Sequence, residues 1–246
     1  MESPTGLTDR GRPKKHYDSI APCYDSQRFG CRCGSIINDV ELSIVRELVA
    51  QNGNVLDVGT GTGRFATILA SASTTTVALD SSRQMISISV AKGEQSERSR
   101  QVSYLVGDGA SLPFSSRSFD AVISVKLLSH FSEIDPFISE MSRVLKTGGR
   151  LITDVPYPLA ELYQRFVRNP SIQSSEDHFH TIPEIERVFK KHSIEISRRV
   201  MYSALPLSVV HLTLCPHTTL FPTRLLHRLL RAKVGFLTFL EGIKGS

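Results

Sequence analysis

Val55-Leu56-Asp57-Val58-Gly59-Thr60-Gly61-Thr62-Gly63 (residues 55–63) is an apolar, strand-like run that ends in a turn with three glycines. Glycine adopts positive φ readily and has no Cβ, so a ligand can approach such a turn closely. The amides that open a following helix favour negative charge, including a ligand carboxylate. The stretch therefore predicts a nucleotide-like ligand at a strand-to-helix turn, near the switch point of a doubly wound sheet.

The spacing of the glycines helps to distinguish a nicotinamide dinucleotide from other nucleotide-like ligands. The dinucleotide fingerprint is G-x-G-x-x-G, and Arg64 occupies the position of its third glycine. This chain has G-x-G-x-G instead, with Asp57 two residues before Gly59. The spacing and the aspartate together favour a ligand other than a nicotinamide dinucleotide.

Two further carboxylates follow the next two expected strands. Asp80 stands at the end of the second strand, where it can accept hydrogen bonds from both hydroxyls of a ribose. Asp108, in Gly107-Asp108-Gly109 after the third strand, can accept from an adenine amino group. Each aspartate alone is more often a turn former or a cap. Together with Asp57 they mark three successive strand ends on one edge of a sheet, which predicts a nucleoside site there.

The pattern around this stretch is one of short apolar runs that alternate with amphipathic segments. Such alternation indicates βαβ units, and hence an α/β, doubly wound, mainly parallel sheet with helices on both faces. The expected strands are 54–58, 76–79, 102–106, 121–125 and 150–155. The expected helices are 36–50 (ended by Gly53), 64–72, 82–92 and 135–145 (closed by Thr147-Gly148-Gly149).

The flanking parts are less regular. We expect residues 1–15 to be a flexible tail and residues 16–246 to be one domain, with N-terminal lid helices over 16–50, a cofactor-binding core over 51–155 and a substrate-specificity part over 156–246. Thr181-Ile182-Pro183-Glu184 has the spacing of a capping box. Residues 194–207 predict a strand or two, as an antiparallel edge, and residues 224–239 predict an amphipathic helix.

The composition is that of an ordinary globular protein. The chain has 246 residues, 40% of them hydrophobic, and a formal net charge of +5, which favours anionic partners only where the positive charge clusters. Its four cysteines form no C-x-x-C pair and have no matching histidine cluster, so we expect no metal site. We see neither a secretory signal nor a membrane span, which predicts a soluble, cytoplasmic protein.

From residue 17 to residue 155 the sequence resembles the class I S-adenosylmethionine-dependent methyltransferases, particularly the ubiquinone/menaquinone-biosynthesis-like (methyltransferase type 11) group. The resemblance rests on motifs that follow one another in order. These are Tyr17-Asp18-x-x-Ala21-x-x-Tyr24-Asp25, the glycine turn, Leu79-Asp80-Ser81 with Met85, Gly107-Asp108-Gly109-x-x-Leu112-Pro113-Phe114, Ser118-Phe119-Asp120, Ser129-His130-Phe131 and Leu145-Lys146-x-Gly148-Gly149-Arg150.

The resemblance implies a seven-stranded, Rossmann-like sheet and S-adenosyl-L-methionine as the cofactor. By the same resemblance, the methionine part would be held at the first strand end, the ribose at Asp80, and the adenosine and adenine by the residues that follow. Tyr17 and Tyr24 would belong to a lid over the cofactor, or else would pack an N-terminal helix. The implied cofactor-binding residues are Tyr17, Tyr24, Asp57, Gly59, Thr60, Gly61, Gly63, Asp80, Ser81, Met85, Asp108 and Gly109.

Methyl transfer from a sulfonium is an in-line displacement, so positioning and exclusion of water supply much of the acceleration. A general base is needed only for some nucleophiles. His130, a few residues after the fourth strand, is the candidate for a base or substrate-orienting group, with packing or capping as the alternative. His178 and His180 are candidates to cover the pocket or are solvated loop residues. Lys126 is an unusual residue directly after the fourth strand, which puts the substrate pocket in doubt.

Aromatic and aliphatic residues after 156 favour a small-molecule acceptor that is at least partly hydrophobic, methylated on O, N or C. A basic bias in the C-terminal part leaves a nucleic-acid methyltransferase as an alternative, although no nucleic-acid-binding module is present. The amphipathic helix predicted over 224–239 leaves a methyltransferase that acts on lipids or quinones at a membrane surface as another alternative. A third alternative is a protein that binds the cofactor and catalyses a cyclisation. The sequence does not predict the oligomeric state.

Overall fold

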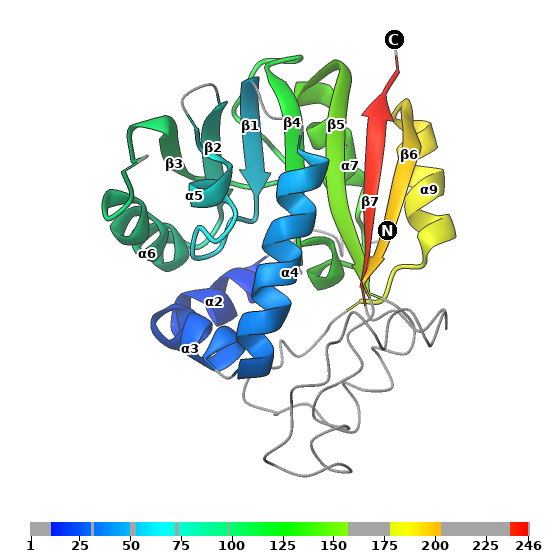
Figure 1. Ribbon diagram of the computed structural model, residues 1–246. Coiled ribbons are helices and arrows are strands. Elements are labelled where there is room, and N and C mark those ends of the chain that lie inside the picture. The colour runs from blue at the N-terminus through cyan, green and yellow to red at the C-terminus, as the bar shows by residue number, and fades with distance from the viewer. Residues whose placement is uncertain are drawn as a thin grey trace, which may run out of the picture.

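The computed structural model describes residues 11–30, 32–49, 53–71, 74–97, 99–156, 178–202 and 237–245. These residues form a seven-stranded sheet in the order β3-β2-β1-β4-β5-β7-β6 (Figure 1). The strands are β1 (Gly53–Val58), β2 (Thr74–Asp80), β3 (Val102–Val106), β4 (Phe119–Ser124), β5 (Leu145–Pro156), β6 (Ile194–Tyr202) and β7 (Leu237–Lys244). The predicted fold class is confirmed.

The first five strands are parallel, and their order creates the switch point at which ligands bind in such sheets. The chain runs outward from β1 through β2 to β3 and then returns to the other side of β1 as β4. Val55 consequently lies between Thr76 of β2 and Ala121 of β4. In open α/β sheets, ligands bind outside the carboxyl ends of the two strands at such a switch point, which here are β1 and β4.

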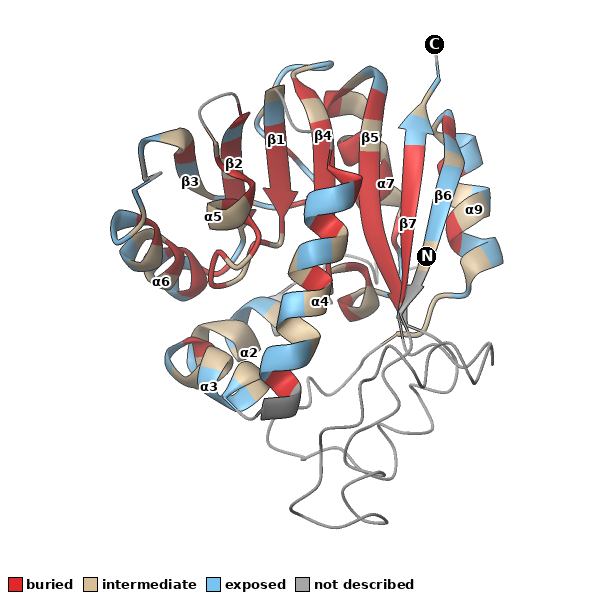
Figure 2. Ribbon diagram, in the orientation of Figure 1, coloured by how far each residue is buried: buried red, intermediate tan, exposed pale blue. Residues whose placement is uncertain are grey.

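Helices cover both faces of the sheet (Figure 1). They are α2 (Gly11–Ile20), α3 (Tyr24–Phe29), α4 (Arg32–Leu48), α5 (Ala66–Leu69), α6 (Arg83–Glu94), α7 (Asp135–Val144) and α9 (Ile182–Lys191), with short 3-10 turns η1 (Ala21–Cys23), η2 (Ser99–Gln101) and η3 (Leu128–His130). Side chains of α4 and α5 form one core cluster with the sheet, and those of α7 and α9 form another. Figure 2 shows the buried residues of α4 on the side toward the sheet. The short helices α2 and α3 lie beyond the carboxyl ends of the parallel strands (Figure 1).

Strand β7 lies antiparallel between β5 and β6, so the predicted helix over 224–239 is wrong for residues 237–239. Residues 224–236 lie outside the described residues. Phe239 packs in the cluster on the α4 face, while its neighbour Leu240 packs in the cluster on the α7 face. The leucines and arginines that predicted a helix lie mainly at 224–231. Within β7, the buried Thr238 and Glu241 interrupt the continuous apolar run by which a strand buried on both faces is recognised.

Several predicted boundaries are also corrected. The tail over 1–15 is wrong from Gly11 onward, where α2 begins, while residues 1–10 lie outside the described residues. Gly53 begins β1 rather than ending a helix. Its φ of +119 lies in a region that favours glycine, and a Cβ there would also lie 2.4 Å from Asp120 Oδ2. The helix predicted over 64–72 is only α5, the four residues Ala66–Leu69.

The glycine pair predicted to close the helix over 135–145 lies inside β5. The helix ends at Val144 and the strand begins at Leu145. Pairing with β4 then shifts register between Phe119 and Ala121, and Gly148 adopts a φ of +76. The extra residues therefore form an irregularity at the start of the strand. At α9, by contrast, the predicted capping box between Thr181 and Glu184 is confirmed.

Candidate functional site

The glycine turn after β1 is held by the neighbouring strand and by glycine's conformational freedom. The amide of Gly59 donates to the carbonyl of Leu79 at 2.8 Å, so the turn folds over the end of β2. Gly59, Gly61 and Gly63 have φ of +76, +56 and +77, values that L side chains adopt only with strain. A Cβ on Gly63 would lie 2.0 Å from Ser89 Oγ of α6, whereas one on Gly61 would meet no atom within 4 Å. Open space therefore lies over the middle of the turn.

Asp57 is buried beneath this turn, with 1% of its surface exposed. Its Oδ2 accepts a 2.7 Å hydrogen bond from the Thr60 hydroxyl. Burial raises the pKa of Asp57 to about 7, and the charge of Asp80 adds to that effect, while the hydrogen bond from Thr60 and the charge of Arg64 oppose it. The protein thus holds a carboxylate whose ionisation is costly without a further positive partner.

Asp80 joins the ends of β1 and β2. Its Oδ2 accepts from the Gly61 amide at 2.9 Å, and its Oδ1 accepts from the Ser82 amide at 2.8 Å. Burial raises the pKa of this carboxyl despite the two amides. A carboxylate has about four lone-pair directions, so two hydrogen bonds leave capacity for two ligand hydroxyls.

Asp108 lies on the same edge of the sheet but is exposed. Its Oδ1 accepts from the Ala110 amide at 2.9 Å, which is the turn-forming behaviour typical of aspartate. The following Gly109 is buried, and a Cβ there would lie 2.8 Å from Val58. The Gly107 amide donates to the carbonyl of Asp80 at 2.9 Å, so the third strand end is tied to the second.

The residues after Asp80 begin helix α6. Ser82, not Ser81, is the N-cap, since its hydroxyl accepts from the Met85 amide at 3.1 Å. Ser81 is exposed, and Met85 is buried with 1% exposed. The Ser82 hydroxyl also donates to Asp18 of α2 at 2.6 Å. The sequence interpretation missed this role of Ser82, although a serine before a helix is a common capping signal.

Tyr17 and His130 meet although 113 residues separate them. The Tyr17 hydroxyl lies 2.7 Å from His130 Nε2, and the two rings form an edge-to-face contact at 5.2 Å. His130 is buried, with 9% exposed, and its positive charge, when present, acts to lower the pKa of Asp80. Tyr24 packs edge-to-face on Tyr17 at 6.0 Å. The lid candidates and the acceptor-side candidate therefore share one cluster.

Two histidines of the predicted substrate-specificity part, residues 156–246, contact the residues on either side of His130. The His178 amide donates to the Ser129 carbonyl at 2.7 Å, and His180 Nε2 lies 2.8 Å from the carbonyl of Phe131. These contacts place the chain after residue 177 against the segment that carries His130.

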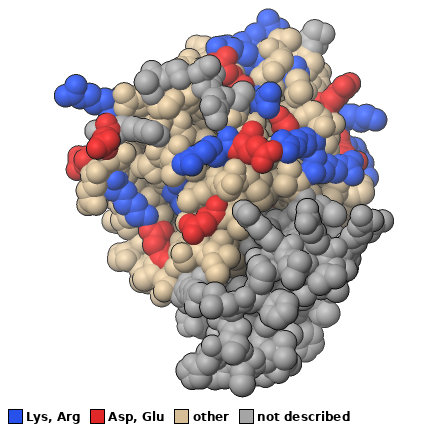
Figure 3. Space-filling model, viewed as in Figure 1, with Lys and Arg blue, Asp and Glu red and all other residues tan. Residues whose placement is uncertain are grey.

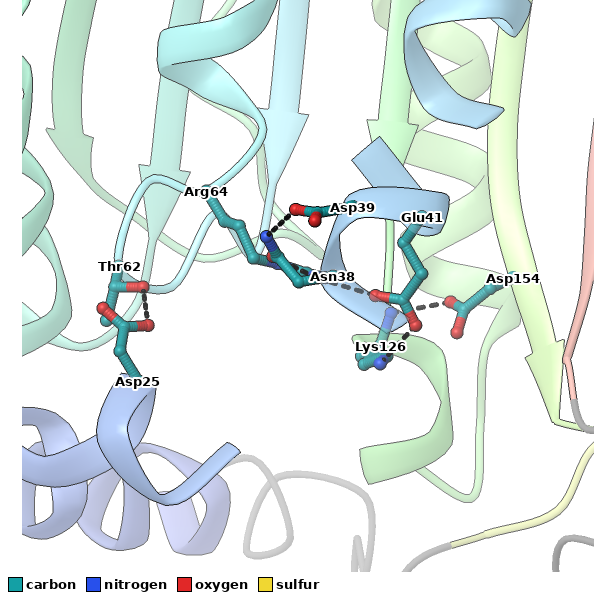
Figure 4. Close-up of polar contacts among 8 residues, drawn as sticks. All are labelled: Asp25, Asn38, Asp39, Glu41, Thr62, Arg64, Lys126 and Asp154. Atoms are coloured by element: carbon teal, nitrogen blue, oxygen red, sulfur yellow. Dashed lines mark hydrogen bonds and ion pairs between the residues drawn. The ribbon is translucent and has the colours of Figure 1, made fainter. Parts of the chain in front are cut away.

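Two polar networks that the sequence interpretation missed fix the N-terminal helices to the turn (Figure 4). In the first, Asp25 of α3 accepts from the Thr62 hydroxyl at 2.8 Å and pairs with Lys92 of α6. Asp25 belongs to the Tyr24-Asp25 motif, so its position could have been found, but not its partners.

The second network centres on Glu41 of α4. Arg64 Nη1 lies 2.7 Å from Glu41 Oε2, and Lys126 Nζ lies 2.6 Å from Glu41 Oε1 (Figure 4). The Lys126 amide donates to Asp154 Oδ1 at 2.6 Å. Burial raises the pKa of Asp154 to about 6, against the hydrogen bond and the charge of Lys126. The unusual Lys126 is therefore a member of an ion-pair network at the ends of β4 and β5.

The charges on the face that Figure 3 shows are mixed: Lys and Arg side chains stand among Asp and Glu side chains. Among the described residues, Arg198 pairs with Glu47 and Arg199 pairs with Glu186. Among the described residues no helix has the length and the apolar character needed to cross a membrane.

The sequence of the core matches a known domain family. Residues 56–153 match the family model described as a methyltransferase domain. These residues carry a methyltransferase domain. The family-level interpretation of the sequence is confirmed, and the matched segment of the methyltransferase domain runs from the middle of β1 to β5.

The chain is also similar in sequence to curated methyltransferases and in fold to solved structures. The "Ubiquinone/menaquinone biosynthesis C-methyltransferase" of Geotalea daltonii is 29% identical over 59% of this chain and 64% of its own length, so the match spans less than two thirds of that relative. The magnesium protoporphyrin IX methyltransferase of Synechocystis PCC 6803 covers 96% of this chain and 100% of its own, at 16% identity and a TM-score of 0.67. A [4+2]-cyclase covers 95% and 96%, at 19% identity and a TM-score of 0.68. The two structures show the shared fold.

Proposed function

We propose that this protein transfers a methyl group from S-adenosylmethionine to a small, partly hydrophobic acceptor at the carboxyl edge of β1 and β4. The observation that carries the proposal is the meeting of two strand ends at the glycine turn. Gly61 donates to Asp80 at 2.9 Å, and Asp57 is buried beneath the same turn. A ligand with an amino-acid part and a ribose needs polar groups at such neighbouring positions.

The residues present fit this cofactor. Open space lies over Gly61, where a Cβ would meet nothing within 4 Å. The raised pKa of Asp57 fits a binding partner that carries a positive charge, as the α-ammonium group of the cofactor does. Asp80 retains acceptor capacity for two ribose hydroxyls. We propose Asp108 and Gly109 for the adenine.

The remaining proposed contacts follow from the same arrangement. Ser81 and Met85 would flank the adenosine, and Tyr17 and Tyr24 would close over it from the N-terminal helices. Gly59, Thr60 and Gly63 would shape the turn around the methionine part. The bound cofactor supplies a methyl group on a positively charged sulfur, which is a good leaving group for an in-line displacement.

His130 is proposed to orient the acceptor or to take its proton. Its ring is buried at the end of β4, beside Tyr17, so both groups would lie where the acceptor enters and water is excluded. The name of the Geotalea daltonii relative supports a quinone-like ring as the first acceptor class to test, with C-methylation among the outcomes.

A cyclase that binds the cofactor without methyl transfer is the second candidate. It is favoured by one observation, the fold shared with the [4+2]-cyclase at a TM-score of 0.68. Methyl-labelled S-adenosylmethionine separates the two, because only a methyltransferase moves the label to an acceptor. Incubation with metabolite extracts and with reduced demethylmenaquinone analogues, followed by mass spectrometry, detects the labelled product.

Asp80→Ala tests the cofactor site directly, with Glu195→Ala on the exposed face of β6 as the matched control. We expect Asp80→Ala to weaken binding of S-adenosylhomocysteine by about a hundredfold, because two charge-assisted hydrogen bonds are lost. Calorimetry measures this affinity. An unchanged affinity in Asp80→Ala would remove the ribose assignment, and a wild-type protein that binds no S-adenosylhomocysteine would refute the proposed function.

A further inference from the structure

Lys126 has a backbone conformation that is unusual for its residue type. It follows β4 directly and has a φ of +60, in the left-handed region that favours glycine. Non-glycine residues persist there only when their surroundings hold them, and they cluster at functional sites. Two contacts hold this one: its amide donates to Asp154 Oδ1 at 2.6 Å, and its Nζ pairs with Glu41 Oε1 at 2.6 Å.

Glu41 holds a second cation at the same time. Its other oxygen, Oε2, lies 2.7 Å from Arg64 Nη1. The side chain of Glu41 is 2% exposed, whereas those of Arg64 and Lys126 are 13% and 25% exposed. Burial alone would raise the pKa of Glu41, but the two cations outweigh it and lower that pKa, so the carboxylate stays ionised.

The two cations belong to the two segments that the proposed reaction must bring together. Arg64 follows Gly63 directly and so continues the glycine turn, residues 59–64, which we term the donor loop. Lys126 begins the segment that carries His130, residues 126–131, which we term the acceptor turn. The two segments also touch, since a Cβ on Gly59 would lie 3.0 Å from the Leu127 side chain.

We propose that Glu41 is a positioning residue that sets the acceptor turn relative to the donor loop by pairing with Lys126 and Arg64 at once. The expected effect on kcat rests on the proposed function. The coupling between the two segments is a property of the ligand-free protein and does not depend on that function. An in-line displacement depends strongly on the distance and angle between donor and acceptor, so a link between the two segments acts on the rate. Figure 4 shows the carboxylate of Glu41 between the two cations.

A purely structural role for Glu41 would be to anchor α4 on the sheet. That role predicts a loss of stability without a local effect on the two segments. The positioning role predicts that the donor loop and the acceptor turn loosen together when the carboxylate is neutralised, and that chemistry suffers more than cofactor binding.

Three variants separate these roles. Glu41→Gln keeps the shape and removes the charge. Lys126→Met removes one cation and leaves the pair between Glu41 and Arg64 in place, so it serves if Glu41→Gln fails to fold. Lys146→Met is the control, because it breaks a more exposed ion pair, with Asp120 (2.8 Å), at the amino end of β4 and away from both segments.

Hydrogen exchange of the ligand-free proteins, followed by mass spectrometry, is the first measurement. Glu41→Gln should speed exchange in both the donor loop and the acceptor turn by about tenfold, Lys126→Met should speed it mainly in the acceptor turn, and Lys146→Met should change neither. Faster exchange spread evenly over the whole protein, or no change in Lys126→Met, would overturn the inference. This measurement needs no cofactor, so it decides the inference even if the proposed function fails.

Kinetics with the methyl acceptor gives the second measurement. Lys126→Met should lower kcat by about tenfold or more while the Kd for S-adenosylhomocysteine stays within about twofold of wild type. Glu41→Gln combined with Lys126→Met should cost less in kcat than the product of the single effects, because the two residues act through one contact. A wild-type kcat in Lys126→Met, or a loss of cofactor affinity that matches the loss of kcat, would contradict the positioning role.

Discussion

Replacing Asp57 with asparagine tests whether the buried carboxylate at the end of β1 receives the positive charge of the cofactor. The pKa of Asp57 is raised to about 7, first by burial and then by the charge of Asp80. A ligand cation binds the ionised form, so binding has to remove the proton below that pH. By linkage, the affinity should fall about tenfold from pH 8 to pH 6, with about 0.9 proton released on binding at pH 6 and about 0.1 at pH 8.

In the protein without ligand, the raised pKa of Asp57 should make the free energy of unfolding depend on pH. The folded pKa of Asp57 lies above the ordinary value of 3.8, so its contribution to stability is complete below about pH 4 and is lost as pH rises to 7. The loss amounts to about 4 kcal/mol at most, from 1.36 kcal/mol for each pH unit between the two pKa values. Asp57→Asn cannot ionise and can still accept from Thr60, so without ligand it should unfold at a higher temperature than wild type at pH 8.

The assay is titration calorimetry with S-adenosylhomocysteine at both pH values, in two buffers of different ionisation enthalpy. Asp57→Asn should bind weakly at pH 8 and lose the pH dependence. Asp154→Asn is the matched control, because that buried carboxyl also has a raised pKa but lies at the end of β5. Equal wild-type affinities at the two pH values, or the same pH dependence in Asp57→Asn, would rule out Asp57 as the group that receives the ligand's positive charge.

Three further outcomes are expected. Tyr17→Phe removes the 2.7 Å contact with His130 and should cost about 1 kcal/mol of unfolding free energy and slow methyl transfer; an unaltered rate in a labelled-methyl assay would contradict a role at the acceptor. Gly63→Ala, with a φ of +77 and a Cβ 2.0 Å from Ser89 Oγ, should cost about 2 kcal/mol or more and weaken cofactor binding, and a wild-type melting temperature would count against it. Thr181→Ala should destabilise by about 1 kcal/mol through loss of the capping box on α9. Because α9 lies away from the glycine turn, the affinity of Thr181→Ala for S-adenosylhomocysteine, measured by calorimetry, should stay at the wild-type value.

The sequence predicted the features that are written in short, local patterns. Alternating apolar runs and amphipathic segments gave the doubly wound sheet, because burial on both faces of a parallel sheet demands such runs. The glycine spacing gave the turn after β1, because positive φ at three positions requires glycine. The capping box at Thr181 was equally visible. Strand β7 was missed because Thr238 and Glu241, which are buried in the structure, interrupt the apolar run that would indicate a buried strand.

Local sequence patterns thus specify the fold class, the glycine turn after β1 and the carboxylates at three successive strand ends. Which side chains meet there depends on tertiary packing. The contacts of Tyr17 with His130 and of Glu41 with Lys126 join residues 113 and 85 positions apart, and they depend on how the N-terminal helices pack against the sheet. No local propensity encodes such distances, since each side chain by itself is compatible with many partners until packing brings one of them within hydrogen-bond reach.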